Sequence, residues 1–388
     1  MTPQYKTSDL FNDMQSWRHD FHRHPELGFE EHRTSAKVAE LLTGFGVEVH
    51  AGVGGTGVVG VLRKGASNKS LALRADMDAL PIEEATNLPH RSQTSGKMHA
   101  CGHDGHTATL LGAAAYLAQS SDFDGTVYFF FQPAEEHGRG ALAMMDDGLF
   151  ERFPTDAVYG MHNMPSIPQG NFATRTGPMM ACEDNFEIVI EGKGTHAAMP
   201  HMGIDPIVLG SELVLSLQSI VSRTVNPIEK AVVSVTEFIT DGSRNILPSQ
   251  VTIRGDVRAF DQAIQDQIKE AMNARVAGVC ATQGATYTFS YSHEFVATVN
   301  TAEETERAAD IAEGIVGEAR VNREGGIVMG SEDFGHMLRH KPGCFFFLGN
   351  DKPGEQTIGL HSPQFDFNDE LLTVGADFWV SLVESELK

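Results

Sequence analysis

Side chains that can bind a metal ion recur in four short segments of this 388-residue sequence. They are Cys101, His103, Glu135, Glu136, His162 and His361. Thiolate, imidazole and carboxylate ligands together suit Zn, Mn, Fe or Co, and the cysteine shifts the preference away from Mg and Ca. A bound divalent ion lowers the pKa of its water, and a nearby carboxylate then accepts the water proton. The set therefore predicts a hydrolytic centre with one or two divalent metal ions.

Each of these residues also has an ordinary structural explanation. Cys101 alone would be a small buried hydrophobe, and the glutamate pair alone would be an exposed start of a helix. Position favours the metal site, because the glutamates and His162 follow apolar runs typical of strands, and α/β sheets bind ligands outside the carboxyl ends of their strands. Asp76 and Asp78 follow another such run. They are equally well explained as ligands, as acceptors that orient a metal-bound histidine, or as turn caps.

Three further candidates lie in the middle of the chain, namely His196 in a glycine-flanked turn, Asn245 and Arg258. A neutral histidine, an asparagine and an arginine are groups that can hold an oxyanion and a substrate carboxylate. From the residues alone, loop chemistry and a surface arginine remain the better explanation of these three.

Two other motifs are assigned structural roles. The glycine-rich segment 52–57 does not join a strand to a helix as a nucleotide-binding loop should, so we expect a turn between two strands. Ser331 lacks the flanking glycines of a nucleophile elbow and is expected to cap a helix.

Apolar periodicity predicts the elements that must position these side chains. Helices are expected over residues 8–24, 31–45 and 107–118, with Ser8 as the N-cap of the first. Apolar strands are expected over residues 58–62, 71–75, 127–131 and 157–160. Strands that are apolar throughout and are separated by helices indicate a sheet covered on both faces, as in the α/β class.

The pattern changes in the middle of the chain, where apolar and polar residues alternate more strictly. Such strands are expected over 186–190, 231–238, 251–260 and 287–291, with helices over 205–222 and 262–281. They predict a small α+β, ferredoxin-like domain with one solvent-facing side. The pattern of apolar strands separated by helices returns after about residue 293, with helices near 302–313 and 369–386 and a strand at 344–348. We therefore expect a discontinuous catalytic domain with a mixed central sheet flanked by helices (1–181 and 293–388), interrupted by an inserted domain (182–292).

Composition narrows the class of protein. The length exceeds what one core usually serves, and 41% hydrophobic residues suffice for two cores. The formal net charge of −23 argues against nucleic acid or an anionic membrane as a partner. No run of about 18 apolar residues and no signal-peptide pattern occurs, and the four cysteines are widely spaced. We expect a cytoplasmic protein that neither spans nor binds a membrane and has no disulfide framework.

The motifs resemble those of a known family, the dinuclear metal amidohydrolases that include hippurate hydrolases, bacterial aminoacylases and plant auxin-conjugate hydrolases. The resemblance runs essentially end to end. The matching segments are His22–Leu27, Arg74–Pro81, Met98–His106, Pro133–Glu136, Gly160–Asn163, Gly194–His201, Gly330–Phe334 and Leu360–Pro363.

The resemblance implies a role for each candidate residue. It implies that the metals, usually Mn, Zn or Co, are held by Cys101, His103, Glu136, His162 and His361. Glu135 would be the general base and acid, and His103 takes the place of the aspartate that bridges two metals in related carboxypeptidases.

The resemblance also implies a homodimer joined through the inserted lid or dimerisation domain. His196 would reach the partner's site and stabilise the oxyanion, and Asn245 and Arg258 would lie near the substrate carboxylate. The reaction expected is hydrolysis of an N-acyl-amino acid to a carboxylic acid and a free amino acid. A metallo-dipeptidase or carboxypeptidase is the alternative within enzymes, and a metal-dependent binding protein without turnover is the alternative outside them. The intact glutamate pair argues against the binding protein.

Overall fold

The computed structural model describes residues 5–388 and divides into two compact units, each with its own apolar core. Unit 1 comprises the described part of Met1–Met179 together with Thr298–Gly326 and Asp333–Lys388. Unit 2 comprises Met180–Ala297 and the short segment Ile327–Glu332. Periodicity gave no sign that this short segment belongs to unit 2, because it joins through a backbone bridge between Met180 and Val328.

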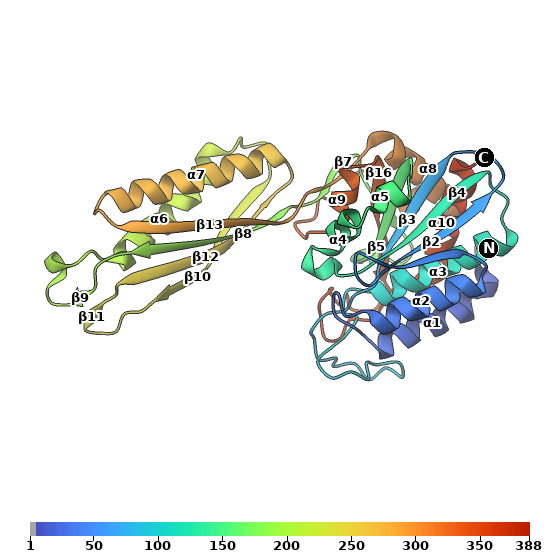
Figure 1. The fold of residues 1–388 in the computed structure, drawn as a ribbon, viewed down its shortest axis with the longest axis horizontal. Coiled ribbons are helices and arrows are strands. Elements are labelled where there is room, and N and C mark those ends of the chain that lie inside the picture. Colours follow the sequence, from blue (N-terminus) through green and yellow to red (C-terminus); the bar gives the residue numbers. More distant parts are fainter. Residues whose placement is uncertain (1–4) are drawn as a thin grey trace. The chain divides into compact units, whose positions relative to one another are not determined.

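Unit 1 is built on a mixed eight-stranded sheet, shown in Figure 1. In spatial order its strands are β1 (Glu48–Val53), β2 (Gly57–Lys64), β4 (Gly125–Gln132), β3 (Ser70–Asp76), β5 (Ala157–Pro168), β16 (Gly343–Asp351), β6 (Phe172–Ala173) and β15 (Val321–Asn322). The central strands β4, β3, β5 and β16 are parallel to their neighbours in this group, whereas β1, β2 and β6 add antiparallel pairs. The carboxyl ends of the four parallel strands therefore lie at one edge of the sheet.

Helices cover both faces of this sheet, as the apolar strands predicted. One face packs against α1 (Phe11–Arg23), α2 (His32–Gly44), α3 (His103–Ser120), α8 (Ala302–Val316) and α10 (Leu371–Glu386). Alternate strand residues such as Leu71, Leu73 and Ala75 enter that core. The other face packs against α4 (Gly140–Asp146), α5 (Leu149–Arg152) and α9 (Phe334–Leu338), through contacts such as that of the Phe334 and Phe345 rings at 5.7 Å. The predicted α/β class is confirmed.

Unit 2 has the order β8 (Glu183–Glu191), α6 (Pro206–Ser219), β10 (Ala231–Thr240), β12 (Gln250–Ala259), α7 (Gln262–Ala281) and β13 (Thr286–Phe295). Its antiparallel sheet runs β10-β12-β8-β13, which is a ferredoxin-like arrangement. The carboxylates of Asp205 and Asp261 cap α6 and α7 by accepting hydrogen bonds from backbone amides of the first turns. Leu209, Leu213 and Leu217, spaced by four residues along α6, are fully buried in the core.

Local predictions failed at a few places. The strand β1 was not predicted, because its residues are mostly half-buried or exposed and carry no apolar run. Helix α3 begins at His103, four residues before the predicted start, so the metal-capable histidine lies inside the helix. Ser8 is not an N-cap, because it starts a short 3-10 helix whose preceding residue is Thr7. Within residues 5–388, no helix is both long and apolar enough to cross a membrane.

Candidate metal centre

Three adjacent parallel strands bring the predicted ligands to one edge of the sheet. Asp76 at the end of β3 pairs in register with Gln132 at the end of β4. Arg74 pairs with Gly160 of β5, so Asp76 and His162 lie two residues further along their strands at the same level. The glutamate pair follows β4 in the short 3-10 helix Glu135–His137. Glu135 and Glu136 therefore follow the end of β4 as predicted, whereas His162 lies within β5 and not after its end, because the strand continues to Pro168 beyond its predicted apolar run.

Helix α3 supplies the cysteine and one histidine at its N-terminus. Gly102 precedes the helix with φ of +98°, in the left-handed region that favours glycine. A Cβ atom at this position would lie 2.2 Å from Asn163 Oδ1, so any other residue would have to displace the buried Asn163 side chain as well as adopt a strained φ. The bend at Gly102 places the side chains of Cys101 and His103 in one group of candidate ligand atoms.

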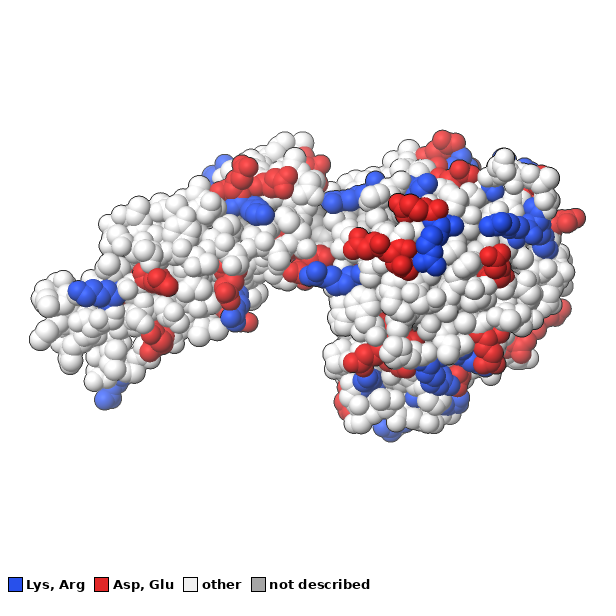
Figure 2. Space-filling model, in the orientation of Figure 1, with Lys and Arg blue, Asp and Glu red and all other residues white. Residues whose placement is uncertain are grey.

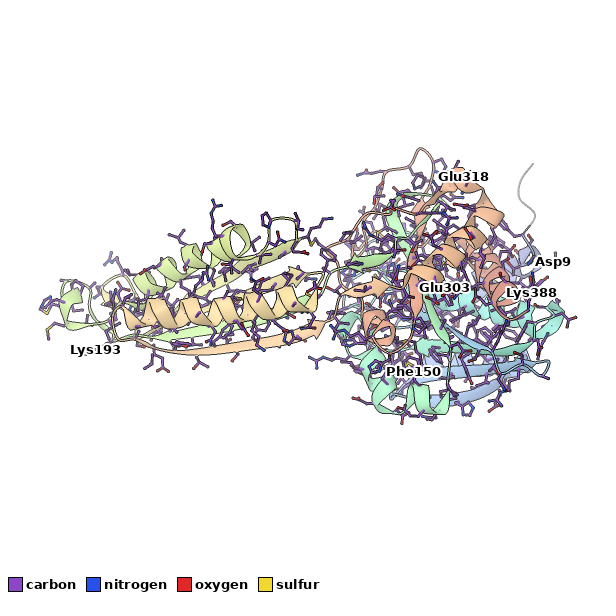
Figure 3. All side chains as sticks on the ribbon, turned by 90° about the horizontal axis from the view of Figure 1, so that it is seen from above. Asp9, Phe150, Lys193, Glu303, Glu318 and Lys388 are labelled. Atoms are coloured by element: carbon purple, nitrogen blue, oxygen red, sulfur yellow. The ribbon has the colours of Figure 1, made fainter. Side chains whose placement is uncertain are left out.

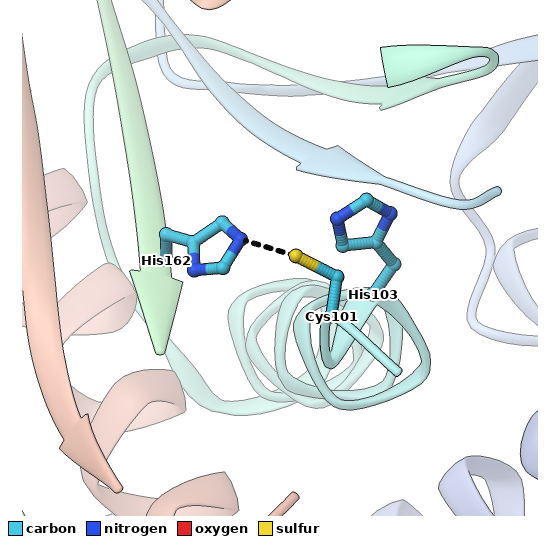
Figure 4. A group of neighbouring side chains, drawn as sticks. All are labelled: Cys101, His103 and His162. Carbon is cyan, nitrogen blue, oxygen red and sulfur yellow. Dashed lines mark hydrogen bonds between the residues drawn. The ribbon is translucent and has the colours of Figure 1, made fainter. Parts of the chain in front are cut away.

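Cys101, His103 and His162 form a buried cluster, drawn in Figure 4. Cys101 Sγ lies 3.3 Å from His162 Nε2, while the other ring nitrogen of His162 is 2.6 Å from the carbonyl oxygen of Asn163. That carbonyl fixes the proton on Nδ1 and leaves Nε2 with a lone pair toward the thiol. The cluster thus presents one sulfur and one imidazole nitrogen in ligand geometry.

Glu135, Glu136 and His361 complete the arrangement. His361 Nε2 lies 3.5 Å from Glu136 Oε2, and Cys101, Glu136 and His361 offer ligand atoms all within 4.8 Å of one another. His103 Nε2 lies 3.9 Å from both Glu135 Oε2 and Glu136 Oε1. The backbone N–H of His361 donates to the carbonyl of Ala100 at 2.8 Å, which ties this distant segment to the one carrying Cys101. The structure therefore brings together all six metal-capable residues singled out in the sequence.

Asp78 acts on two of these residues without joining the ligand clusters. Its Oδ1 accepts from His103 Nδ1 at 3.1 Å, and its Oδ2 accepts from the backbone N–H of Glu136 at 3.0 Å. The carbonyl of Asp78 also lies 2.9 Å from His103 Nδ1. Of the three explanations left open for Asp78, the geometry favours an acceptor that orients a ligand histidine.

A second buried network behind the ligands went unassigned in the sequence. His106 Nδ1 donates to Asp76 Oδ1 at 2.6 Å, and His106 Nε2 accepts from the backbone N–H of Asn163 at 3.0 Å. Arg74 donates to Asp76 Oδ2 at 2.8 Å and to Asp333 Oδ1 at 3.1 Å. Two features of the sequence could have revealed this network. Arg74 stands in an apolar strand two residues before Asp76, and His106 lies about one helical turn after His103.

The carboxylates around the cluster favour positive charge within it. Burial alone would lower the pKa of His103, but Asp76 and the neighbouring carboxylates outweigh burial and raise that pKa to about 10. Burial raises the pKa of the Cys101 thiol, and Glu136 raises it further. Burial lowers the pKa of His162, which stays a neutral imidazole.

Two atoms of the cluster also fit a site for a positive ion, because neither has a hydrogen-bond partner in the described part of the chain. His103 Nε2 and Glu136 Oε1 are buried without a hydrogen-bond partner, although buried polar atoms are almost always paired. Both face the same group of ligand atoms. A sulfur, imidazole nitrogens and carboxylate oxygens within this spacing fit one or two divalent transition-metal ions.

Unit 2 brings together two of the three residues predicted to bind substrate, His196 and Asn245, and places Arg258 far from them. His196 in β9 (Thr195–His196) pairs with Ile246 of β11 (Ile246–Leu247), and the carbonyl of Asn245 accepts from Ala197 N–H at 3.0 Å. Both therefore lie where β9 and β11 form a small sheet, at the end of unit 2 marked by Lys193 in Figure 3. Arg258 stands near the far end of β12, about 25 Å of strand away. One copy of unit 2 does not bring His196 and Arg258 together.

Arg258 is already paired with carboxylates of its own unit. Its Nη2 lies 2.7 Å from Glu183 Oε2, its Nε lies 2.9 Å from Asp256 Oδ1, and its Nη1 donates to Ser331 Oγ at 2.5 Å. Ser331 was predicted to cap a helix, which is wrong, because α9 begins at Phe334 after Asp333 and Ser331 binds Arg258 instead. The glycine-rich segment 52–57 does form the predicted turn, joining β1 to β2.

Comparison with known proteins places this chain in a family. Residues 72–385 match the model of peptidase family M20/M25/M40. The chain is 42% identical over 380 residues to a hippurate hydrolase of Campylobacter jejuni, covering 98% of each chain. It is 39% identical to a thermostable carboxypeptidase of Saccharolobus solfataricus, covering 96% of this chain and 95% of the other. A solved structure of a Bacillus subtilis protein, described as a dinuclear metal-binding peptidase, matches with a TM-score of 0.85 at 33% identity, covering 98% and 99% of the two chains.

The chain belongs to peptidase family M20/M25/M40. Its fold is shared with the Bacillus subtilis structure and its sequence with the hippurate hydrolase, and the chain is an amidohydrolase.

Proposed function

We propose that this protein hydrolyses the amide bond of N-acyl-L-amino acids and releases a carboxylic acid and a free amino acid. The observation that carries the proposal is the adjacent glutamate pair beside a buried Cys/His cluster. Such a pair allows one carboxylate to bind metal and the other to move a proton. The hippurate hydrolase relative, whose name gives an N-acyl-amino acid as substrate, supports this choice.

The proposed ligands are Cys101, His103, Glu136, His162 and His361. When bound, one or two divalent ions would polarise the amide carbonyl and lower the pKa of a water molecule. Mn, Zn and Co all suit this donor set, since it mixes sulfur, nitrogen and oxygen.

Glu135 is proposed as the general base and acid. Glu135 is 6% exposed, and its Oε2 lies 3.9 Å from the orphaned Nε2 of His103, in the same group of candidate ligand atoms. In this role it takes the proton of the attacking water and returns it to the leaving nitrogen. Burial of the carboxylate excludes bulk water from the proton transfer.

His196, Asn245 and Arg258 are proposed to hold the tetrahedral oxyanion and the substrate carboxylate. Because His196 and Arg258 lie at opposite ends of unit 2, a single copy does not present them to one substrate. This separation supports a homodimer in which His196 serves the partner's site. Arg258 would exchange at least one of its present carboxylate partners for the substrate carboxylate.

Exposed apolar residues of unit 2 support dimerisation through this unit. Ile207, Val208 and Leu215 of α6 are 39%, 52% and 74% exposed. Their spacing of seven to eight residues places them on one face of the helix. Strand β10 is an edge strand of the sheet and exposes Phe238 and Ile239.

The cysteines and the surface charge support the proposed cellular location and the proposed small-molecule partner. All four cysteines are buried and unpaired, which supports the proposed location in the cytoplasm. Figure 2 shows acidic and basic side chains interspersed on the displayed face, without a continuous basic patch there. A small-molecule substrate fits this surface better than nucleic acid or membrane.

A carboxypeptidase is the second candidate, supported by the Saccharolobus solfataricus relative. The deciding experiment measures free amine released from N-benzoylglycine, N-acetylmethionine, indole-acetyl-aspartate and two plain dipeptides, by Mn-loaded and by chelator-stripped protein. Metal-dependent cleavage of the acyl substrates is the expected result. Cleavage of the dipeptides alone would replace the proposal by the second candidate, and release that survives chelation would reject the metal mechanism.

A further inference from the structure

The turn that carries the glutamate pair is built on a strained residue. Ala134 has φ of +47° and ψ of +41°, which is the left-handed conformation that L-residues other than glycine, asparagine and aspartate rarely adopt. Its side chain is fully buried. Backbone strain of this kind persists only where surrounding structure holds it, and it concentrates at functional sites. The next residue along the chain is Glu135.

One side chain holds this turn in place. Glu31 Oε1 accepts from the backbone N–H of Ala134 at 2.8 Å, and Glu31 Oε2 accepts from the hydroxyl of Thr56 at 2.5 Å. Glu31 is fully buried, and Thr56 is 5% exposed. The carboxylate therefore links the strained turn to the start of β2, an element of the central sheet.

The ordinary alternative is that Glu31 serves its own helix. Glu31 occupies the N-cap position of α2, yet its side chain makes no hydrogen bond to the helix amides. Glutamate is also not among the residues preferred at N-caps. The carboxylate instead reaches a residue more than one hundred positions away in the chain. This contact makes a role in positioning the turn better founded than a role in helix capping.

The turn is held from its other side as well. Asp78 Oδ2 accepts from the N–H of Glu136, so the amides on both sides of Glu135 are bound by buried carboxylates. Asp78 is also tied to His103. Among the described residues, the Glu31 carboxylate accepts hydrogen bonds from Ala134 and Thr56 and from none of the proposed metal ligands, which makes its contribution separable by mutation.

We propose that Glu31 is a positioning residue for catalysis, which holds Ala134 in its left-handed conformation and thereby directs the Glu135 carboxylate toward the cluster of candidate ligand atoms. The inference rests on the proposed role of Glu135 as general base. A misplacement of a catalytic group by about 1 Å can cost about a hundredfold in rate. Removing Glu31 is therefore expected to lower kcat while KM and metal binding stay unchanged.

The test compares Glu31→Ala, Glu31→Gln and Glu31→Asp on the most rapidly cleaved substrate of the panel. The alanine variant should lose about 10- to 100-fold in kcat. Glutamine should restore most of it, because its carbonyl oxygen can accept from Ala134 while its NH₂ donates to the Thr56 hydroxyl. Aspartate keeps the charge but is one methylene shorter, so it should stay impaired. Mn²⁺ affinity of the stripped protein, measured by EPR titration, should be equal in all three.

Asp156 offers a matched control. Its carboxylate also accepts from one backbone amide and one hydroxyl, both of Ser70, at the amino end of β3 away from the ligands. Asp156→Ala should leave kcat, KM and Mn²⁺ affinity unchanged. Ala134→Gly tests the strain directly, because glycine adopts positive φ without cost. The melting temperature of Ala134→Gly should therefore be higher than that of the wild-type protein.

Several results would overturn the inference. An unaltered kcat in Glu31→Ala, a parallel loss of Mn²⁺ affinity, or glutamine as inactive as alanine would each do so. If Glu31→Ala does not fold, the aspartate variant carries the same test. Glu135→Gln is measured in parallel: if it retains turnover the proposed function itself fails, whereas an inactive Glu135→Gln with a fully active Glu31→Ala rejects only the role of Glu31.

Discussion

The two units place the ion pairs of two of their arginines in different surroundings. In unit 1 the fully buried Arg18 binds Asp104 at 2.8 Å and Asp369 at 3.2 Å, and it also pairs with Asp366. In unit 2 a comparable arginine, Arg254, forms its ion pairs on the surface. Buried ion pairs are costly to desolvate and add little net stability, so net stability alone does not explain the ion pairs of Arg18. The ion pairs of Arg18 are buried in unit 1 and those of Arg254 are exposed in unit 2, although unit 2 also buries a carboxylate, that of Asp184, which accepts from Gln265 and Tyr291.

The partners of Arg18 lie next to two segments that carry candidate ligands. Asp104 lies in the first turn of α3, directly after His103, while Asp366 and Asp369 follow the segment that carries His361. One guanidinium on α1 therefore connects two ligand-bearing segments that are far apart in sequence.

The largest effect should come from the chemistry assigned to unit 1. Glu135→Gln removes a general base, so kcat should fall by about 2 to 4 orders of magnitude while metal content stays constant. Steady-state kinetics and elemental analysis measure the two quantities. Glu151→Gln on the nearby surface helix α5 is the control and should be fully active. Normal turnover by Glu135→Gln would contradict the assignment of the general base to Glu135 of unit 1.

The next largest effect should come from breaking the buried charge network. Arg18→Met leaves the Asp104 carboxylate buried without its cation, which should lower the free energy of unfolding by about 3 to 5 kcal/mol. Urea denaturation measures the change. Arg254→Met, which removes an exposed arginine, should leave the unfolding midpoint where it is. Equal losses in the two variants would contradict the contrast between the units.

Unit 2 should respond to the loss of apolar volume. Leu213 is fully buried on α6, so Leu213→Ala should cost about 2 to 5 kcal/mol through lost burial and a cavity. Leu215, two residues away on the same helix, is 74% exposed. Leu215→Asp should leave the fold stable and weaken self-association, as sedimentation velocity would record. A fully associated Leu215→Asp protein would argue against α6 as part of the dimer contact.

The smallest effect should be a pH dependence of stability in unit 1. Burial alone would raise the pKa of Glu84, but hydrogen bonds from His22, Thr86 and the Ser92 amide outweigh burial and hold that pKa at about 2. A depressed folded-state pKa means that the stabilisation is complete above about pH 4.5 and is lost as the pH falls toward 2. Glu84→Gln should flatten the fall of the unfolding free energy between these pH values. An identical acid dependence in wild type and variant would refute the assignment.

Local patterns determine which parts of this structure could be predicted. Helix α7 spans residues 262–281 as its periodicity indicated, and β3 and β4 cover their predicted apolar runs. The types of the ligand residues were also visible, because Cys, His and Glu recur beyond those runs. The roles carried over from the family resemblance remain predictions.

Long-range partners could not be predicted in the same way. The contact of Glu31 with Ala134 and that of Arg258 with Ser331 join residues far apart in the chain, and no local pattern marks either. The left-handed Ala134 is likewise held by tertiary contacts, since alanine has no intrinsic preference for that conformation.

The division of the chain has a practical consequence for protein engineering. The polypeptide crosses between the units four times, at residues 179/180, 297/298, 326/327 and 332/333. A deletion variant that joins residue 179 to residue 298 would discard the ferredoxin-like fold but retain 327–332, whose bridge partner Met180 would be gone. Excision of unit 2 therefore requires two splices, with the second one replacing six residues just ahead of Asp333, which anchors Arg74 behind the ligand cluster.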